Sequence, residues 1–485
     1  MNKKLLIILF LALVVRLVHI SYPISGWHSW RQADTGAIAR NFHETGQSII
    51  YPQIDWAGNS QGFVESEFHI YPYIVSTLYS IFGMDDMWGR VVSIIFSLFT
   101  IYGLFLLVRK YISEKTALWA AFIYAFIPMN IYFGRAFMPE SAMLCCSVFG
   151  IYFFSQWMDK QNLKNFLLAF LFVSFAILIK LPTAYIGLPL LFLALNKYGG
   201  RAFINWKIIL FVILVFIPVA LWYYHAHQLF INGGASFGIW NAGEDKWGNF
   251  NLIITPKFYN DIFLASIAER HLTYAGFVMF LVGLFIKRQS MQERLFDWWL
   301  IAVIVYFLIV AKGNNVHDYY QLPFALPASV FIGKAFAKVI DPDNIRQSFI
   351  RSKLWFSFTS IVLVCLLLLS YFRMANFMSK EDVNSPIFKL SNEMQSVSSR
   401  DDLVITMSSG NPAVLYHTHR KGWVAWTVQL NDEYFNEKIS AGAKYVIGEK
   451  SDLKSDGDFT AIQSLMEKYT TVSNNDEYYI IRLTN

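Results

Sequence analysis

A tryptophan-rich polar segment near the amino end of the chain holds the first residue that could do chemistry. Residues 27–35 read Trp-His-Ser-Trp-Arg-Gln-Ala-Asp-Thr, and few helix breakers follow, so we expect a helix over 33–42. Asp34 begins that helix, and its carboxylate could act as a general base on an incoming nucleophile. Helix capping, or pairing with Arg31 or Arg40, would account for the same carboxylate without catalysis.

The next polar cluster, residues 65–69, reads Glu-Ser-Glu-Phe-His. Two carboxylates and an imidazole within five positions, Glu65, Glu67 and His69, could bind a divalent cation or hold a sugar. A solvated loop of ordinary polar residues is the alternative. The spacing alone does not decide between them.

Further candidates flank the apolar segments. Glu140 opens an apolar helix just after Arg135, where the positive end of the helix dipole favours an anion, so capping competes with function. Lys180 ends another apolar helix, where it could neutralise a phosphate or simply snorkel to the membrane interface. His317 precedes Tyr319 and Tyr320; it could accept a proton, bind phosphate or be an ordinary loop residue.

Composition identifies the kind of protein that must position these groups. The chain has 485 residues, of which 55% are hydrophobic and 15% charged. Soluble domains carry about 25% charged residues, so both a cytosolic enzyme and a disordered chain are excluded. The formal charge of +6 comes from basic residues in short connections between apolar runs, which argues against nucleic-acid binding. All three cysteines lie inside apolar runs, so neither a disulfide framework nor a thiolate metal site is expected.

The apolar runs predict a polytopic all-α membrane protein. Each is about 17–22 residues long, enough to span a bilayer as a helix. We expect about eleven spans, at residues 5–20, 87–108, 115–133, 139–157, 164–180, 182–196, 206–224, 271–287, 295–311, 320–339 and 354–372. Every second connection is rich in Lys and Arg, which places the amino terminus in the cytoplasm and two long loops, 21–86 and 225–271, outside. Residues 71–82 are too short to span and are expected to lie in the interface.

The last part of the chain has a different pattern. Short strand-like runs at 403–406, 444–447 and 478–482 alternate with helical patterns at 431–440 and 459–469. We therefore divide the chain into a transmembrane domain, 1–372, and an extracytoplasmic α/β domain, 373–485. The predicted topology brings all the polar clusters to the outer face, as an active site at a membrane surface would require.

These motifs resemble the dolichyl-phosphate-mannose-protein mannosyltransferase superfamily. The specific likeness is to bacterial glycosyltransferase family 39 members with the GT-C fold, to which the lipid A aminoarabinose transferases are related. It covers about residues 1–340 and follows the order of the motifs: Trp30–Asp34, Glu67–Tyr73, Trp88–Arg90, Arg135–Glu140, Lys180–Pro182 and His317–Pro323.

The resemblance implies an integral inner-membrane enzyme that moves a sugar from a polyprenyl-phosphate donor to an envelope acceptor on the outer face. Lipid A, a polysaccharide, a protein or another glycan could be that acceptor. Asp34 maps to the base and Glu140 to an orienting carboxylate, with Glu67 as a further catalytic candidate. Substrate-binding candidates are Arg31, His69, Arg135, Lys180, His317, Tyr319 and Tyr320.

The expected chemistry needs one base and no metal. A phosphate leaving group requires no acid of its own, so inversion is expected, with the leaving charge met by basic groups. Glu65, Glu67 and His69 could still hold a divalent cation. Two departures from the family pattern leave the phosphate-binding residue open: Ala33 precedes Asp34 where many relatives have a second acid, and Pro72 stands alone where many have paired prolines.

A transporter or flippase of lipid-linked sugars is the competing interpretation. Transporters bury ionisable residues near the midplane and often contain inverted repeats. In this chain Arg16 is the main charge deep in a predicted span, and the sequence has no visible repeat. Both observations favour the transferase.

Overall fold

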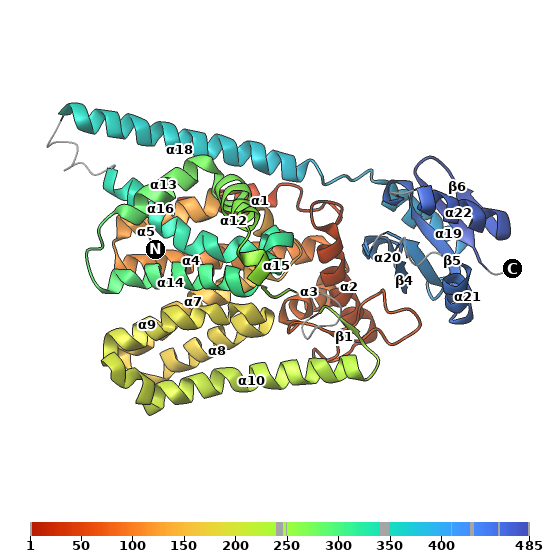
Figure 1. Ribbon diagram of the computed structural model, residues 1–485, viewed down its shortest axis with the longest axis horizontal. Coiled ribbons are helices and arrows are strands. Elements are labelled where there is room, and N and C mark those ends of the chain that lie inside the picture. The colour runs from red at the N-terminus through yellow and green to blue at the C-terminus, as the bar shows by residue number, and fades with distance from the viewer. Residues whose placement is uncertain are drawn as a thin grey trace. The chain divides into compact units, whose positions relative to one another are not determined.

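The helices seen in Figure 1 belong to two compact units. The computed structural model describes residues 2–238, 246–248, 250–339, 349–408, 410–426, 431–453 and 456–483. The first unit, here the helical unit, comprises Met1–Ile20, Arg90–Tyr224 and Gly243–Met378. The second, here the loop–sheet unit, comprises Ser21–Gly89, His225–Ala242 and Ser379–Asn485. The first long loop thus packs with the carboxyl-terminal part of the chain.

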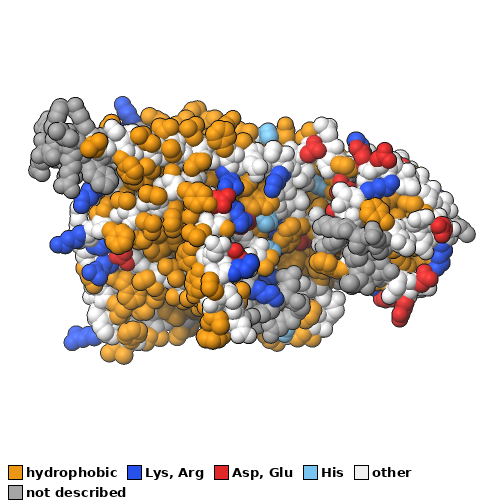
Figure 2. Space-filling view, turned by 45° about the horizontal axis from the view of Figure 1, so that its top comes forward, with side chains coloured by type: hydrophobic (Ala, Val, Ile, Leu, Met, Phe, Trp, Pro, Cys, Tyr) orange, Lys and Arg blue, Asp and Glu red, His pale blue; other side chains and the backbone are white. Residues whose placement is uncertain are grey.

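Long apolar helices dominate the helical unit. Four stretches in the described part of the chain are long and apolar enough to cross a membrane: α4 (Met87–Tyr111), α7 (Glu140–Lys160), α10 (Trp206–Ile231) and Phe356–Met378 of α18 (Phe349–Met378). The shorter apolar helices are α8 (Leu163–Ile179) and α13 (Thr273–Phe285) in this unit and α3 (Ile70–Phe82) in the loop–sheet unit. Figure 2 shows many apolar side chains on one face of the helical unit, and Leu221 of α10 and Ile361 of α18 are more than half exposed. Such faces suit a lipid environment.

Several predicted spans are interrupted. The helix expected at 115–133 is split into α5 (Glu114–Phe126) and α6 (Pro128–Phe133), because Pro128 lacks an N–H and disfavours a helical Ile127. Those expected at 182–196 and 320–339 begin as 3-10 turns, Leu181–Ile186 and Asp318–Phe324. The other main helices of this unit are α1 (Lys3–Leu17), α9 (Gly187–Tyr198), α14 (Leu295–Ile309) and α16 (Ala325–Val339).

Arg16 of α1 holds the break between α5 and α6. Its guanidinium is fully buried and donates to Ser97 Oγ at 3.0 Å. It also donates to the carbonyls of Ala12, Ala125 and Asn130 at 3.0, 3.1 and 3.0 Å. The last two flank the break, where the helix cannot satisfy every carbonyl itself. Arg16, the main charged residue deep in the predicted spans, therefore has a structural role, because all these hydrogen bonds are to the protein itself.

The loop–sheet unit combines helices from the first loop with a sheet. Its elements include α2 (Ser29–Thr45), α3 and a short parallel pair, β1 (Val64–Glu65) with β2 (Ala235–Ser236). Its main sheet has the order β4-β3-β5-β7-β6, parallel from β4 to β5 and antiparallel from β5 to β6. The strands are β3 (Leu403–Met407), β4 (Gly422–Ala425), β5 (Ala443–Glu449), β6 (Thr470–Asn474) and β7 (Tyr478–Arg482).

This sheet confirms the predicted α/β character of the tail. Helices α19 (Pro386–Val397), α20 (Ala413–Thr418), α21 (Asp432–Ser440) and α22 (Asp456–Lys468) accompany it. Ile405, Val446 and Ile481 of three adjacent strands pack into one buried cluster. Strand β6 was not predicted, because its sequence Thr-Thr-Val-Ser-Asn lies at an exposed edge and has no apolar alternation.

Helix α2 corrects one expectation about Asp34. It begins at Ser29 rather than at residue 33, and His28 occupies the N-cap position. Asp34 therefore lies in the second turn of the helix, and the capping explanation for this residue is wrong.

Candidate active site

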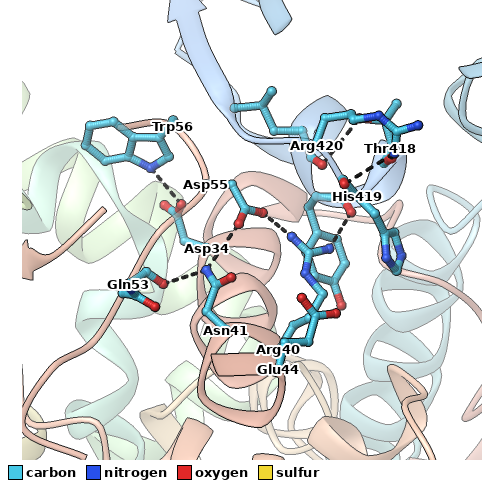
Figure 3. A network of polar contacts seen from close by, with 12 residues as sticks. Asp34, Arg40, Asn41, Glu44, Gln53, Asp55, Trp56, Thr418, His419 and Arg420 are labelled. Carbon is cyan, nitrogen blue, oxygen red and sulfur yellow. Dashed lines mark hydrogen bonds and ion pairs between the residues drawn. The ribbon is translucent and has the colours of Figure 1, made fainter. Parts of the chain in front are cut away.

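Asp34 is a buried carboxylate with one aromatic N–H donor. Asp34 is 4% exposed, and its Oδ1 accepts a hydrogen bond of 3.0 Å from Trp56 Nε1 (Figure 3). Burial raises the pKa of Asp34 to about 7; Arg31 and the Trp56 bond oppose this rise, and the negative charge of Asp55 adds to it. A carboxylate with such a pKa can exchange a proton near neutral pH.

Arg31 connects Asp34 to the acidic cluster before α3. It lies one turn before Asp34 and forms an ion pair with Glu67. His69 is buried and its Nε2 lies 2.5 Å from Ser66 Oγ. Burial and the nearby Arg31 lower the pKa of His69 to about 3, so its imidazole is neutral at physiological pH. The structure thus brings two of the predicted clusters together within the loop–sheet unit.

The cation site considered for Glu65, Glu67 and His69 is not supported. Glu65 is fully buried and accepts from Ser236 Oγ at 2.5 Å, with His227 Nδ1 at 2.8 Å. Glu67 instead pairs with Arg31. Over the described ranges of the chain, no group of three His, Cys, Asp or Glu side chains could hold a metal ion. Glu65 and Glu67 are thus engaged with protein partners.

In the helical unit, Glu140 and Lys180 form an ion pair beside two tyrosines. Glu140 is the first residue of α7 and is 1% exposed; its Oε1 lies 2.9 Å from Lys180 Nζ. Lys180 Nζ also lies 4.8 Å from the ring centroid of Tyr319 and 4.2 Å from that of Tyr320. Three segments far apart in the sequence meet here.

The remaining candidates lie around these groups in the same unit. The ring of His317 stacks on that of Tyr319, with centroids 5.4 Å apart. Asp318, between them, pairs with Arg270 at 2.9 Å. Arg135 is 1% exposed and donates to the carbonyl of His19 at 2.9 Å, so one of its contacts fixes the backbone after α1. A small pocket next to these residues is lined by Ser97, Tyr124, Asn130, Phe133, Gly134, Glu140, Ser141, Leu144 and Leu322.

The chain is similar to known proteins in sequence and in fold. Residues 69–223 match the family model described as dolichyl-phosphate-mannose-protein mannosyltransferase. An uncharacterized protein of Aquifex aeolicus is 25% identical over 266 residues, which cover 54% of this chain and 58% of that protein. The chain therefore spans less than two thirds of the length of this relative.

Solved structures match over almost the whole chain. ArnT from Cupriavidus metallidurans, bound to undecaprenyl phosphate, has a TM-score of 0.67 at 13% identity, covering 98% of this chain and 97% of that one. The chain has the GT-C fold of membrane glycosyltransferases. AglB from Archaeoglobus fulgidus, in complex with an inhibitory peptide and a dolichol-phosphate, has a TM-score of 0.59 at 11% identity, covering 92% and 69%. The resemblance inferred from the motifs is confirmed.

Within this GT-C fold, the sequence motifs missed the residues that surround Asp34. Trp56 and Asp55 come from the stretch after α2, and Arg40 and Asn41 come from α2 itself. Asn41 follows Asp34 by two helical turns on the same face, a spacing that could have indicated a shared contact. Tyr416, which contacts Arg40, lies in the distant tail, and no local pattern links the two.

Proposed function

We propose that this chain is a glycosyltransferase that takes its sugar from a polyprenyl-phosphate donor and transfers it to an envelope acceptor. The observation that carries the proposal is Asp34, a buried carboxylate whose pKa lies near 7, in a chain with the GT-C fold. The acceptor is lipid A, a polysaccharide, a protein or another glycan. Undecaprenyl phosphate in the ArnT complex supports the choice of donor lipid.

The proposed reaction is a single displacement. An acceptor hydroxyl or amine attacks the anomeric carbon and gives its proton to Asp34, while the bond from that carbon to the phosphate oxygen breaks. The bonding electrons leave with the polyprenyl phosphate, which needs no protonation to depart. The anomeric configuration is therefore inverted. Lys180, Arg31 and His317 are the candidates for meeting the phosphate charge.

The proposed setting is the outer face of the inner membrane. About eleven spans, with a cytoplasmic amino terminus, would put the loop–sheet unit outside and leave apolar helices to shelter the polyprenyl chain. Phosphatase or fluorescent-protein reporters fused after Met378 should report an extracytoplasmic position. A cytoplasmic signal there would contradict this topology.

A donor panel tests the activity itself. The full chain, reconstituted in lipid vesicles, should release polyprenyl phosphate from at least one polyprenyl-phosphate sugar when envelope acceptors are present. Asp34→Asn is the matched control and should release none above background. If the wild-type protein moved the intact lipid across the bilayer without cleaving it, the flippase interpretation would replace the transferase.

A further inference from the structure

The stretch after α2 is held as a strap against that helix. We define the strap as residues 53–58, Gln-Ile-Asp-Trp-Ala-Gly. Asn41 Nδ2 donates to the carbonyl of Gln53 at 2.9 Å and to Asp55 Oδ1 at 3.1 Å. Arg40 forms a buried ion pair with the same Asp55 (Figure 3). Arg40 and Asn41, which are adjacent on α2, therefore fix Asp55, the residue that precedes Trp56.

The other side of the strap is bound by the carboxyl-terminal sheet. Gly422, the first residue of β4, donates its N–H to the carbonyl of Asp55 at 2.9 Å. Its own carbonyl accepts from the N–H of Gly58 at 2.7 Å. A Cβ on Gly58 would lie 2.2 Å from Trp423 Nε1, so only glycine allows this approach. The strap is thus clamped between α2 and a strand from the distant tail.

A third contact joins the tail directly to α2. Arg40 Nη1 donates to the carbonyl of Tyr416 at 2.7 Å, and Arg40 Cζ lies 4.9 Å from the Tyr416 ring centroid. One turn earlier, a Cβ on Gly36 would lie 2.8 Å from Tyr416 Oη. The Tyr416 hydroxyl donates to Asp86. Arg40 therefore binds both the strap, through Asp55, and the tail, through Tyr416.

We propose that the carboxyl-terminal sheet domain positions the catalytic base, because its strand β4 and Tyr416 fix the strap and α2 and so hold the Trp56 indole N–H against Asp34. Trp56 and Arg40 are positioning residues, which act on the reaction only through Asp34. This inference rests on the proposed function, since it takes Asp34 as the base. It gives the tail a role that does not require the tail to touch a substrate.

The electrostatic consequence can be measured. In the loop–sheet unit the charged groups around Asp34 are Arg31 on α2, with its partner Glu67, and Asp55 on the strap; the neighbouring His69 is neutral. The Trp56 bond favours the ionised carboxylate, so its removal raises the pKa of Asp34. The acid limb of the pH profile of kcat/KM reports this group in the free enzyme.

Trp56→Phe is the sharpest test. Phenylalanine keeps the apolar packing of Trp56 against Ile38, Phe42, Ile54 and Val64 but removes the N–H. We expect kcat/KM at pH 7 to fall by about ten-fold and the acid limb to move to higher pH by about one unit. A residue with only a structural role would lower the thermal stability and leave the limb in place. A rate and a limb equal to those of the wild type would overturn the proposal.

Arg40→Gln, compared with Arg400→Gln, tests the role of the tail. Arg400 also ties the tail to α2, through Glu44, but both side chains are substantially exposed and neither contacts the strap. We expect Arg40→Gln to lower kcat/KM by about ten-fold or more with an upward shift of the acid limb, and Arg400→Gln to stay within about two-fold of wild type. Equal effects of the two variants would contradict the proposal.

Failure of this inference and failure of the proposed function give different results. If the wild-type chain released no polyprenyl phosphate from any donor, the proposed function would fail. If Asp34→Asn retained full turnover, the transferase would stand, but Asp34 would not be its base and this inference would be overturned with that assignment. If Asp34→Asn were inactive while Trp56→Phe and Arg40→Gln, both folded, kept the wild-type profile, only the role of the strap and tail would be overturned.

Discussion

Asp34→Asn is expected to lower turnover by about a thousand-fold or more and, at the same time, to stabilise the protein above pH 7. The loss of rate follows because an amide cannot take the acceptor proton. The gain in stability follows from burial: the pKa of Asp34 is about 7 in the folded protein against 3.8 for an ordinary aspartate. Ionising this group in place therefore costs folding free energy on the order of 4 kcal/mol.

The pH dependence of this gain has a defined sign. A carboxyl whose pKa is higher in the folded state holds its proton more tightly there, so its contribution to stability is greatest below pH 4 and is lost as the pH rises through 7. Asparagine does not ionise, so the variant does not lose this stability as the pH rises, and its amide oxygen can still accept the hydrogen bond from the Trp56 N–H. The difference in melting temperature between variant and wild type should be large at pH 8 and small at pH 4. A variant that is less stable at both pH values would show that Asp34 is a structural residue.

Lys180→Met is expected to give the second large effect, a fall of about a hundred-fold in kcat/KM for the donor. The substitution removes the cation between Glu140, Tyr319 and Tyr320 and leaves a carboxylate that is 1% exposed. Because an anionic lipid phosphate is bound before and after transfer, most of the loss should appear in KM. Breaking the buried pair should also destabilise the protein by about 3 kcal/mol.

The double variant Lys180→Met, Glu140→Gln separates binding from stability. It removes both charges of the pair, so most of the lost stability should return while the donor KM stays high. Thermal unfolding and donor titration of the single and double variants measure the two effects independently. If donor KM recovered together with stability in the double variant, Lys180 would serve the fold and another basic residue would bind the phosphate.

The sequence was sufficient for those features of the molecule that depend on local patterns. Continuous apolar runs located α4, α7, α10 and α18, because a membrane helix must satisfy its backbone within itself and cover itself with apolar side chains. Short motifs named both halves of the Glu140–Lys180 pair. The resemblance stated from the same motifs agrees with the family model that matches residues 69–223 and with the GT-C fold of the solved structures.

The features that escaped prediction depend on contacts between distant segments. The break before Pro128 is tolerated because Arg16, over a hundred positions earlier in the chain, donates hydrogen bonds to the backbone carbonyls on either side of it. The first loop was assigned to the membrane domain, yet it packs with the tail, since Arg40 and Asp55 meet Tyr416 and Gly422. A two-residue strand pair such as β1 with β2 offers no periodicity to detect.

The composite make-up of the loop–sheet unit has a consequence for biosynthesis. Asp34 leaves the ribosome early, but the sheet that clamps its strap is encoded only by Ser379–Asn485. At about 5–20 residues per second, strand β4 is synthesised tens of seconds after Asp34. Nascent and prematurely terminated chains would thus lack the contacts that, on the inference above, hold Trp56 against Asp34.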